Sequence, residues 1–261
     1  MSCFHHDNYK GEIAYNSEKL RFESAGEQDA GRLAAMYADI SIHAGNYRRR
    51  LDPSTPDSFE KIGGMFVVHR EDSILKEIAG GNSFFAAIKD SGGRIVASLW
   101  VSRSDPSFAD FDQMSFPSLP EAQRRMIEIA LRDGKVLYPR EIIVDPGYRC
   151  IGMADILCYT VFTAARANGY ACSLGEVYRV RGCRIDGVAI EADMLNQGGY
   201  KTILGMGGRF IGAFPLREAQ TGSLAVTIES QVFSLCYDEV LPVLEQSIFN
   251  CGASVYWEDR V

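Results

Sequence analysis

The sequence lacks the features that are typical of membrane, secreted and nucleic-acid-binding proteins. No apolar run among its 261 residues is long enough to span a bilayer. Residues Met1 to Asp7 have neither the basic start nor the apolar core of a signal peptide. Lys and Arg number 27 against 34 Asp and Glu, and the net charge of −7 argues against nucleic acid or an anionic membrane as the main partner. We therefore expect a cytoplasmic protein with no nucleic-acid and no membrane partner.

The cysteines also lack a pattern that points to chemistry. They number seven, which is odd, and none forms a Cys-x-x-Cys pair, so neither a disulfide framework nor a zinc site is expected. Cys3, His5 and His6 lie close together in an N-terminal segment that offers no preformed geometry for an ion. The sequence therefore predicts no metal site.

Two common nucleotide-binding motifs are missing as well. The chain has no Gly-x4-Gly-Lys-Ser/Thr loop and no Gly-x-Gly-x-x-Gly run after a strand at the start of a βαβ unit. Their absence argues against a P-loop NTPase and against a Rossmann-type dinucleotide-binding protein. With 46% hydrophobic and 23% charged residues, the chain can still bury one substantial core.

What is present is a loop, residues 144–154, between a predicted strand and a predicted helix. Residues 136–144 are rich in β-branched and aromatic side chains and end at Asp-Pro-Gly, and apolar residues then recur at helical spacing from residue 153 to Asn168-Gly169. The first N–H groups of a helix have no intrahelical partner and lie at the positive end of its dipole. Arg149 adds a full charge, while Gly152 and Ala154 are small enough for close approach of a ligand. The loop therefore predicts a site for a phosphate or pyrophosphate, in which Cys150 contributes its N–H rather than its side chain.

The remaining pattern gives a coarse order of elements. Ser24-Ala25-Gly26-Glu27 and Ser118-Leu119-Pro120-Glu121 match the capping box that starts a helix. The Arg48-Arg49-Arg50 cluster is interpreted as a solvated loop face, or alternatively as a contact for a phosphate. The predicted elements are strand 20–23, helices 27–40 and 72–79, hairpin 83–88 and 94–101, an inserted helix near 121–130, strand 136–144, helix 153–167, strand 170–180, helix 185–197 and hairpin 200–206 and 209–214.

These elements divide the chain into three parts. Residues 1–18 are predicted to be an N-terminal tail, and residues 19–214 to form the main domain, with an insertion at 103–135. Residues 215–261 are predicted to form a small α/β extension with a strand at 224–228, a helix within 238–249 and a strand at 253–257. This extension could lengthen the sheet, cover the substrate site or form the contact of a homodimer, and the sequence leaves all three open.

The run Arg149-Cys150-Ile151-Gly152-Met153-Ala154 resembles the Arg/Gln-x-x-Gly-x-Gly/Ala motif of the GNAT superfamily of acyl-CoA-dependent N-acyltransferases. The order of elements over residues 19–214, about three quarters of the chain, is also similar to that family's order. The resemblance implies an α/β fold with a mixed, mostly antiparallel central sheet flanked by helices. It also implies acetyl-CoA or another acyl-CoA as co-substrate, with the pyrophosphate on residues 149–154 and the pantetheine on the backbone of Ile142, Ile143 and Val144.

The same resemblance implies the chemistry. The reaction would be direct attack of an amine on the thioester in a ternary complex, with most of the rate coming from positioning and backbone donors. Glu141 is the candidate general base and Glu176 is its rival. The family's usual tyrosine acid aligns with Leu195, so the acid is missing at that place, and Tyr178 or Tyr200 are the substitutes considered.

The sequence supports three hypotheses about function. The first is an N-acyltransferase, most simply an acetyltransferase, that acts on a small-molecule or peptide amine. The second is a related but non-catalytic protein that binds acyl-CoA as a sensor or scaffold. The third is a phosphate-binding protein of unrelated fold in which the six-residue match is accidental.

Overall fold

A computed structural model describes residues 9–105, 108, 119–149 and 152–258. Their strands are joined in one sheet with the order β10-β11-β6-β5-β4-β3-β2-β1-β12, while β7 and β8 pair with β6 and β9 pairs with β11. The strands are β1 (Lys10–Tyr15), β2 (Glu18–Ser24), β3 (Ser83–Lys89), β4 (Ile95–Ser102), β5 (Val136–Val144), β6 (Cys172–Ile185), β7 (Val188–Ile190), β8 (Met194–Leu195), β9 (Arg209–Ala213), β10 (Arg217–Thr221), β11 (Leu224–Cys236) and β12 (Ala253–Trp257).

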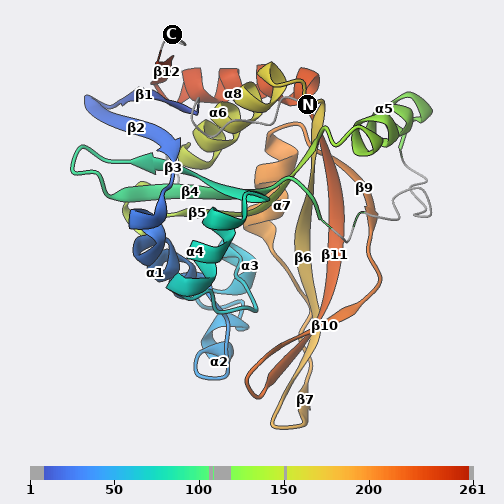
Figure 1. The fold of residues 1–261 in the computed structure, drawn as a ribbon. Coiled ribbons are helices and arrows are strands. Elements are labelled where there is room, and N and C mark those ends of the chain that lie inside the picture. The colour runs from blue at the N-terminus through green and yellow to red at the C-terminus, as the bar shows by residue number, and fades with distance from the viewer. Residues whose placement is uncertain (1–8, 106–107, 109–118, 150–151, 259–261) are drawn as a thin grey trace.

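Helices lie on both faces of the sheet (Figure 1). In the described residues they are α1 (Ala30–Ile40), α2 (Tyr47–Arg50), α3 (Phe59–Ile62), α4 (Glu71–Gly80), α5 (Glu121–Arg132), α6 (Met153–Ala167), α7 (Gln197–Gly205) and α8 (Tyr237–Asn250). The largest core cluster forms where α6 and α8 cover one face, with Ile156, Leu157 and Leu244 fully buried. A second cluster forms where α1 and α4 cover the other face around Tyr37 and Ile74. This α/β arrangement of a mostly antiparallel sheet between helices confirms the predicted fold class.

The sheet changes from antiparallel to parallel pairing between β5 and β6. Every other neighbouring pair in the described residues is antiparallel, whereas β5 and β6 are parallel and pair only at Val136–Leu137 with Cys172–Ser173. Beyond that point the two strands separate. β6 continues for a further stretch paired with β11, and the two form an arm that carries β7 and β10 at its far end (Figure 1).

Both ends of the chain belong to this sheet. The prediction of a tail over residues 1–18 is wrong for residues 9–18, because β1 pairs with β2 and β12 and buries Tyr9 and Ile13. Exposed and buried residues alternate in β1 as in any half-buried strand, but Gly11 and Ala14 are small, and this weakens the contrast in the sequence. Of the three roles left open for residues 215–261, the structure shows the first, since β11 pairs along β6 and β12 forms the opposite edge.

The predicted elements between residues 185 and 206 are wrong. The predicted helix 185–197 is replaced by β7 and β8, and the predicted strand 200–206 is the helix α7. The side chain of Asn196 accepts a hydrogen bond from Gly199 N at 2.8 Å and so caps α7, a signal that the neighbouring glycines obscured. The capping box at Ser24 is also wrong, because the N–H of Gly26 donates to Asp29 Oδ2 at 2.9 Å instead. Ser118 lies outside the described residues.

No helix in the described part of the chain is long and apolar enough to cross a membrane.

Candidate functional site

The gap between β5 and β6 leaves backbone groups of β5 without a strand partner. The N–H of Asp145 donates to the carbonyl of Val96 on β4 at 2.8 Å, and bonded residues alternate along an antiparallel ladder. Ile143 is therefore the next residue bonded to β4, whereas the N–H and C=O groups of Ile142 and Val144 point toward the gap. Ile143 cannot pair on both sides, so the backbone role predicted for residues 142–144 falls to Ile142 and Val144.

A β-bulge sets the direction of the side chains at this point. Trp100 of β4 pairs with Glu141 and the next residue of β4 pairs with Pro139, so Arg140 is the extra residue of β5. Glu141 then shares the face of Ile143, opposite Ile142, as the alternation of a strand requires. Glu141 lines both of the cavities that lie at the gap between β5 and β6.

The first cavity, called here the inner cavity, has a volume of about 310 Å³. It lies between β5, β6, α6 and α7 and takes walls from Ile142, Val144 and Val177. Arg149 and Ala154 of the predicted anion loop line one end of it, and α7 contributes its first turn. Its walls are mainly apolar, which suits a ligand that is chain-like in the middle and anionic at one end.

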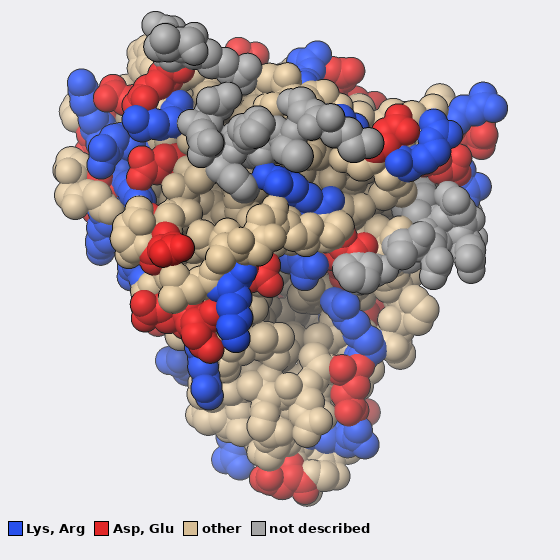
Figure 2. All heavy atoms as spheres, viewed as in Figure 1, with Lys and Arg blue, Asp and Glu red and all other residues tan. Residues whose placement is uncertain are grey.

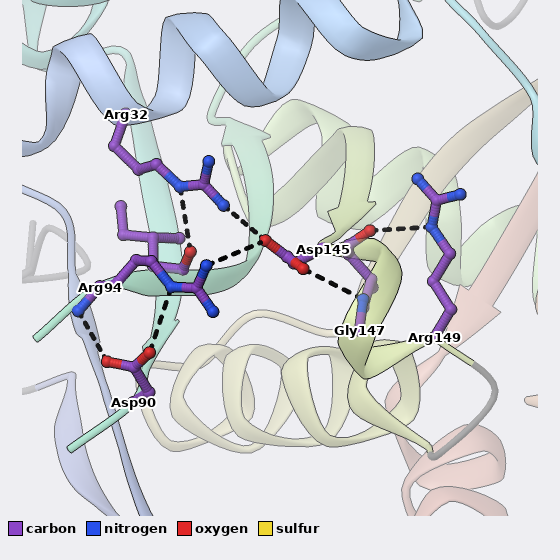
Figure 3. A network of polar contacts seen from close by, with 8 residues as sticks. Arg32, Asp90, Arg94, Asp145, Gly147 and Arg149 are labelled. Carbon is purple, nitrogen blue, oxygen red and sulfur yellow. Dashed lines mark hydrogen bonds and ion pairs between the residues drawn. The ribbon is translucent and has the colours of Figure 1, made fainter. Parts of the chain in front are cut away.

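The anion loop is fixed by an ion-pair network (Figure 3). The carboxylate of Asp145 accepts from Gly147 N at 3.1 Å and from Arg32 Nη2 at 2.7 Å, and Arg94 lies 3.8 Å away. Arg32 belongs to α1 and Arg94 precedes β4, so the start of the loop is held against two separate elements. This network fixes Asp145 and Gly147 at the start of the loop.

Arg149 is oriented by the strand that precedes it. Its Nε donates to the carbonyl of Val144 at 3.0 Å, and Figure 3 shows the end of its guanidinium pointing away from the Asp145 network. No other hydrogen bond or ion pair of Arg149 is found among the described residues, so its two terminal nitrogens can donate to an anion in the inner cavity.

The N-terminus of α6 provides the remaining donors. Gly152 has φ of +83°, and a Cβ there would lie 3.0 Å from Cys251 Sγ, so the glycine is required both by the backbone and by packing. The N–H groups of Met153, Ala154 and Asp155 have no intrahelical acceptor. The side chain of Met153 is buried in the core, so only its backbone is available. Cys150 and Ile151, also predicted to bind the co-substrate, lie outside the described residues.

The second cavity, called here the aromatic cavity, has a volume of about 380 Å³ and lies on the other side of Glu141. Its walls include Phe66, His69, Trp100, Phe108, Tyr138 and Tyr178. Figure 2 shows a hollow in this face of the molecule, with basic side chains on both sides of it. The aromatic and inner cavities share Pro139, Arg140, Glu141, Glu176 and Tyr178, so they meet at the gap between β5 and β6.

The shared residues have shifted pKa values. Burial raises the pKa of Glu141 from 4.5 to about 8, and no hydrogen bond or ion pair of its carboxyl is found in the described residues. The pKa of Tyr178 is raised to about 12, first by burial and then by the charge of Glu176. Burial also raises the pKa of Glu176, although Ser230 and Arg217 oppose the shift. At neutral pH the Tyr178 hydroxyl therefore holds its proton, while Glu141 titrates near pH 8.

The other predicted residues lie elsewhere or serve the structure. Tyr200 lines neither cavity and packs edge-on against Phe233 with ring centroids 5.7 Å apart. Leu195 lies in β8 rather than on a helix, so the alignment that put it at the acid's place is wrong. Glu176 is bound by Arg217, with 3.3 Å between Oε2 and Nη2.

The arginine cluster is divided, because Arg48 and Arg49 are exposed as the solvated-face interpretation expected, whereas Arg50 is buried. Arg50 is 1% exposed and donates to the carbonyls of Ile40 at 3.2 Å, Gly63 at 2.6 Å and Asp57. These bonds hold the segment between α1 and α3 closed, so the interpretation of a solvated face is wrong for this residue. Arg50 lines neither cavity.

Two contributors to the site were not identified from the sequence. Arg217 of β10 reaches the aromatic cavity and Asn196 reaches the inner cavity. Neither has a local signal beyond the capping pattern of Asn196, because their places depend on strand pairing over long range. No group of three or more His, Cys, Asp or Glu side chains able to hold a metal occurs in the described part of the chain.

No protein-family model and no curated protein matches the sequence. Solved structures do match the fold. An N-acetyltransferase from Staphylococcus aureus Mu50 superposes with a TM-score of 0.50 at 12% identity, over 84% of this chain and 98% of the other. RimJ of Mycobacterium smegmatis, solved in complex with CoA-disulfide, gives a TM-score of 0.52 at 11% identity, over 95% of this chain and 96% of its own. The chain therefore has the fold of the GNAT superfamily, as the six-residue motif and the element order predicted.

Proposed function

We propose that the protein is an N-acyltransferase that moves an acyl group, most simply acetyl, from acyl-CoA to an amine. The observation that carries the proposal is the pair of cavities that meet at Glu141 and Tyr178 through the gap between β5 and β6. One cavity ends at the N-terminus of α6 and the other is walled by aromatic side chains, so two different reactants can approach the same point from opposite sides. Direct transfer between two bound reactants needs this arrangement.

The inner cavity suits coenzyme A. Its pyrophosphate fits the N–H groups at the start of α6 together with Arg149, and its pantetheine fits beside the unpaired backbone of Ile142 and Val144. RimJ of Mycobacterium smegmatis, which shares the fold, was solved with a coenzyme A derivative, and this supports the same class of ligand here. Ala154 has no bulk that would obstruct the pyrophosphate.

The residues at the junction fit the two proton transfers. An amine must lose a proton to attack the thioester, and a carboxylate with a pKa of about 8 is a suitable general base near neutral pH. The departing thiolate needs a proton, which the neutral Tyr178 hydroxyl can donate. We assign Glu141 as base and Tyr178 as acid, and the backbone groups of β5 that face the gap can polarise the thioester carbonyl.

Thermal unfolding with acetyl-CoA tests the binding step. At about a hundredfold excess over Kd, the ligand should raise Tm by about 5–10 °C. The Ala154→Glu variant places a carboxylate at the anion site and should lose this shift, yet fold normally because an acidic residue in the first turn favours a helix. Ala154→Gln has nearly the same size without the charge and should lose part of the shift, because its bulk alone obstructs the pyrophosphate. An equal shift in all three proteins would contradict the assignment of the loop.

Release of free coenzyme A thiol across a panel of primary amines tests the chemical step. Turnover that depends on both acetyl-CoA and the amine supports the enzyme. Stabilisation by acetyl-CoA without turnover on any amine would favour a non-catalytic acyl-CoA sensor or scaffold. If acetyl-CoA neither stabilises the protein nor is turned over, both the enzyme and the sensor hypotheses are contradicted.

A further inference from the structure

The aromatic cavity carries information about the acceptor. Its walls offer rings from five strands and loops, including Phe66, Trp100, Phe108 and Tyr138. Contact between these rings and an apolar group of a ligand removes apolar surface from water, which favours binding. The acceptor should therefore have an apolar or aromatic body rather than a chain of charges or hydroxyls.

Two arginines enter the same cavity in fixed positions. Arg140, the extra residue of the β5 bulge, donates from Nε to Ser102 Oγ at 2.8 Å and lies 3.3 Å from Asp105, with its guanidinium 5.8 Å from the centroid of Trp100. Arg140 has no paired residue on β4 because of the bulge, and its side chain lines the cavity. Its Nη1 has no bond in the described part of the chain.

The second arginine lies on a different strand from Arg140. Arg217 of β10 uses Nη2 to bind Glu176 at 3.3 Å, and its guanidinium lies 5.2 Å from the centroid of Tyr178. Its guanidinium also donates to the Tyr178 side chain, so the N–H groups outside these two contacts are the ones left for a ligand. An arginine that is already oriented by a carboxylate and a ring loses little freedom when it binds a second anion, and its planar fork matches a carboxylate.

The charges of the cavity do not favour a polycation. Asp105 and Glu176 are balanced by Arg140 and Arg217, and burial keeps the pKa of His69 below its usual value. Glu141 is largely protonated at pH 7. The cavity is thus close to neutral overall, with Arg140 beside Glu141 at the junction with the inner cavity and Arg217 in the aromatic cavity alone.

We propose that the acceptor is a free α-amino acid with an apolar or aromatic side chain, whose carboxylate is bound by Arg140 and Arg217 and whose amine faces Glu141. This inference rests on the proposed N-acyltransferase function. The amine nitrogen attacks the thioester carbonyl carbon, the new C–N bond forms and the C–S bond breaks. The ammonium group first loses one proton to Glu141, which releases it to water, and Glu141 then takes a second proton from the nitrogen as the C–N bond forms. The thiolate of coenzyme A takes a proton from Tyr178, which water reprotonates, giving an N-acyl amino acid and free coenzyme A with net release of one proton.

Matched pairs of acceptors test the proposal. L-Phenylalanine, L-leucine and L-tryptophan are compared with phenethylamine, isoamylamine and tryptamine, which keep the amine and the apolar body but lack the carboxylate. L-Phenylalaninamide keeps the size of the carboxyl group without its charge. For the full-length protein saturated with coenzyme A, both the affinity by calorimetry and kcat/KM with acetyl-CoA should favour the acids by about tenfold or more.

Substitutions locate the effect. Arg217→Gln and Arg140→Gln should each bring the ratio between acid and amine toward one, and Arg217→Lys, which keeps the charge and loses the fork, should fall between. Arg181→Gln is the control, since Arg181 on β6 binds Glu229 at 2.9 Å and lines neither cavity, and it should keep the full ratio.

The outcomes separate the two claims. A ratio near one in the native protein, or a preference for the amines, overturns the amino acid proposal even when the amines are acylated and coenzyme A binds. A carboxylate preference that survives both arginine substitutions also overturns it. Failure of coenzyme A to stabilise the protein would instead remove the proposed function on which it rests.

Discussion

Replacing Glu141 by Gln should stabilise the protein at alkaline pH while it removes the proposed general base. Burial holds the pKa of this carboxyl at about 8 in the folded protein, against an ordinary value of 4.5. The folded state therefore keeps a proton that the unfolded state releases, and stability falls as the pH rises from about 4.5 to about 8 before it levels off. Glutamine cannot ionise, so the variant is free of this loss.

The size of the effect follows from the shift. A difference of one in pKa corresponds to about 1.36 kcal/mol. Ionising Glu141 in the folded protein therefore costs at most about 5 kcal/mol at pH 9, and less than about 1 kcal/mol of this cost is present at pH 5. Because the cavities admit water to this half-buried residue, about 4 kcal/mol is a ceiling for the change between the two pH values.

Chemical denaturation of the native protein and the Glu141→Gln variant at pH 5, 7 and 9 measures this difference in the free energy of unfolding. The gain in free energy of unfolding should grow with pH, and kcat/KM for acyl transfer should fall by about a hundredfold to ten-thousandfold. Glu12→Gln, at an exposed position of β1, controls for the exchange of carboxyl for amide and should change stability by less than about 0.5 kcal/mol. A difference in free energy of unfolding that does not depend on pH would refute the raised pKa of Glu141. Undiminished kcat/KM would refute its role as the general base.

Three further substitutions have defined outcomes. Tyr178→Phe removes the proposed acid and should lower kcat by about tenfold or more with KM for acetyl-CoA unchanged, as steady-state kinetics would show. Asp145→Asn weakens the pairing with Arg32 but can still accept from Gly147, so it should cost about 1 kcal/mol of stability and raise the Kd of coenzyme A several-fold in calorimetry; an unchanged Kd would separate the network from the anion site. Arg50→Gln leaves buried carbonyls unpaired and should cost about 3 kcal/mol or more in urea unfolding, whereas a loss below about 1 kcal/mol would mean that water replaces the guanidinium.

The two elements on either side of the predicted anion loop, which the sequence predicted correctly, have strong local signals. The strand over residues 136–144 and the helix from Met153 both carry clear periodicity, and the short segment between them holds Arg149 and Gly152 at a recognisable spacing. The position of Glu141 on the face opposite Ile142 followed from alternation alone. Local pattern was enough here because neighbouring residues in the chain build this half of the site.

The acceptor half could not be predicted in the same way. Its walls come from the segment 65–69, from β4, β5 and β6, and from Arg217 of β10. Only the pairing of β6 with β11, and of β11 with β10, brings Arg217 near the others. The helix α7 was missed because Gly198 and Gly199 lower helix propensity, while the cap by Asn196 acts through a side chain. Strand β1 was missed because small residues weaken the contrast between its exposed and buried positions.

A crystal structure of the protein with coenzyme A tests the central claim most directly. The account predicts the pyrophosphate within hydrogen-bond distance of the N–H groups of Met153 to Asp155 and of Arg149, and the pantetheine beside the backbone of Ile142 in the gap between β5 and β6. It also predicts the sulfur at the junction of the two cavities, next to Glu141 and Tyr178. Coenzyme A bound outside the inner cavity, or bound there with its sulfur directed away from Glu141, would contradict the account.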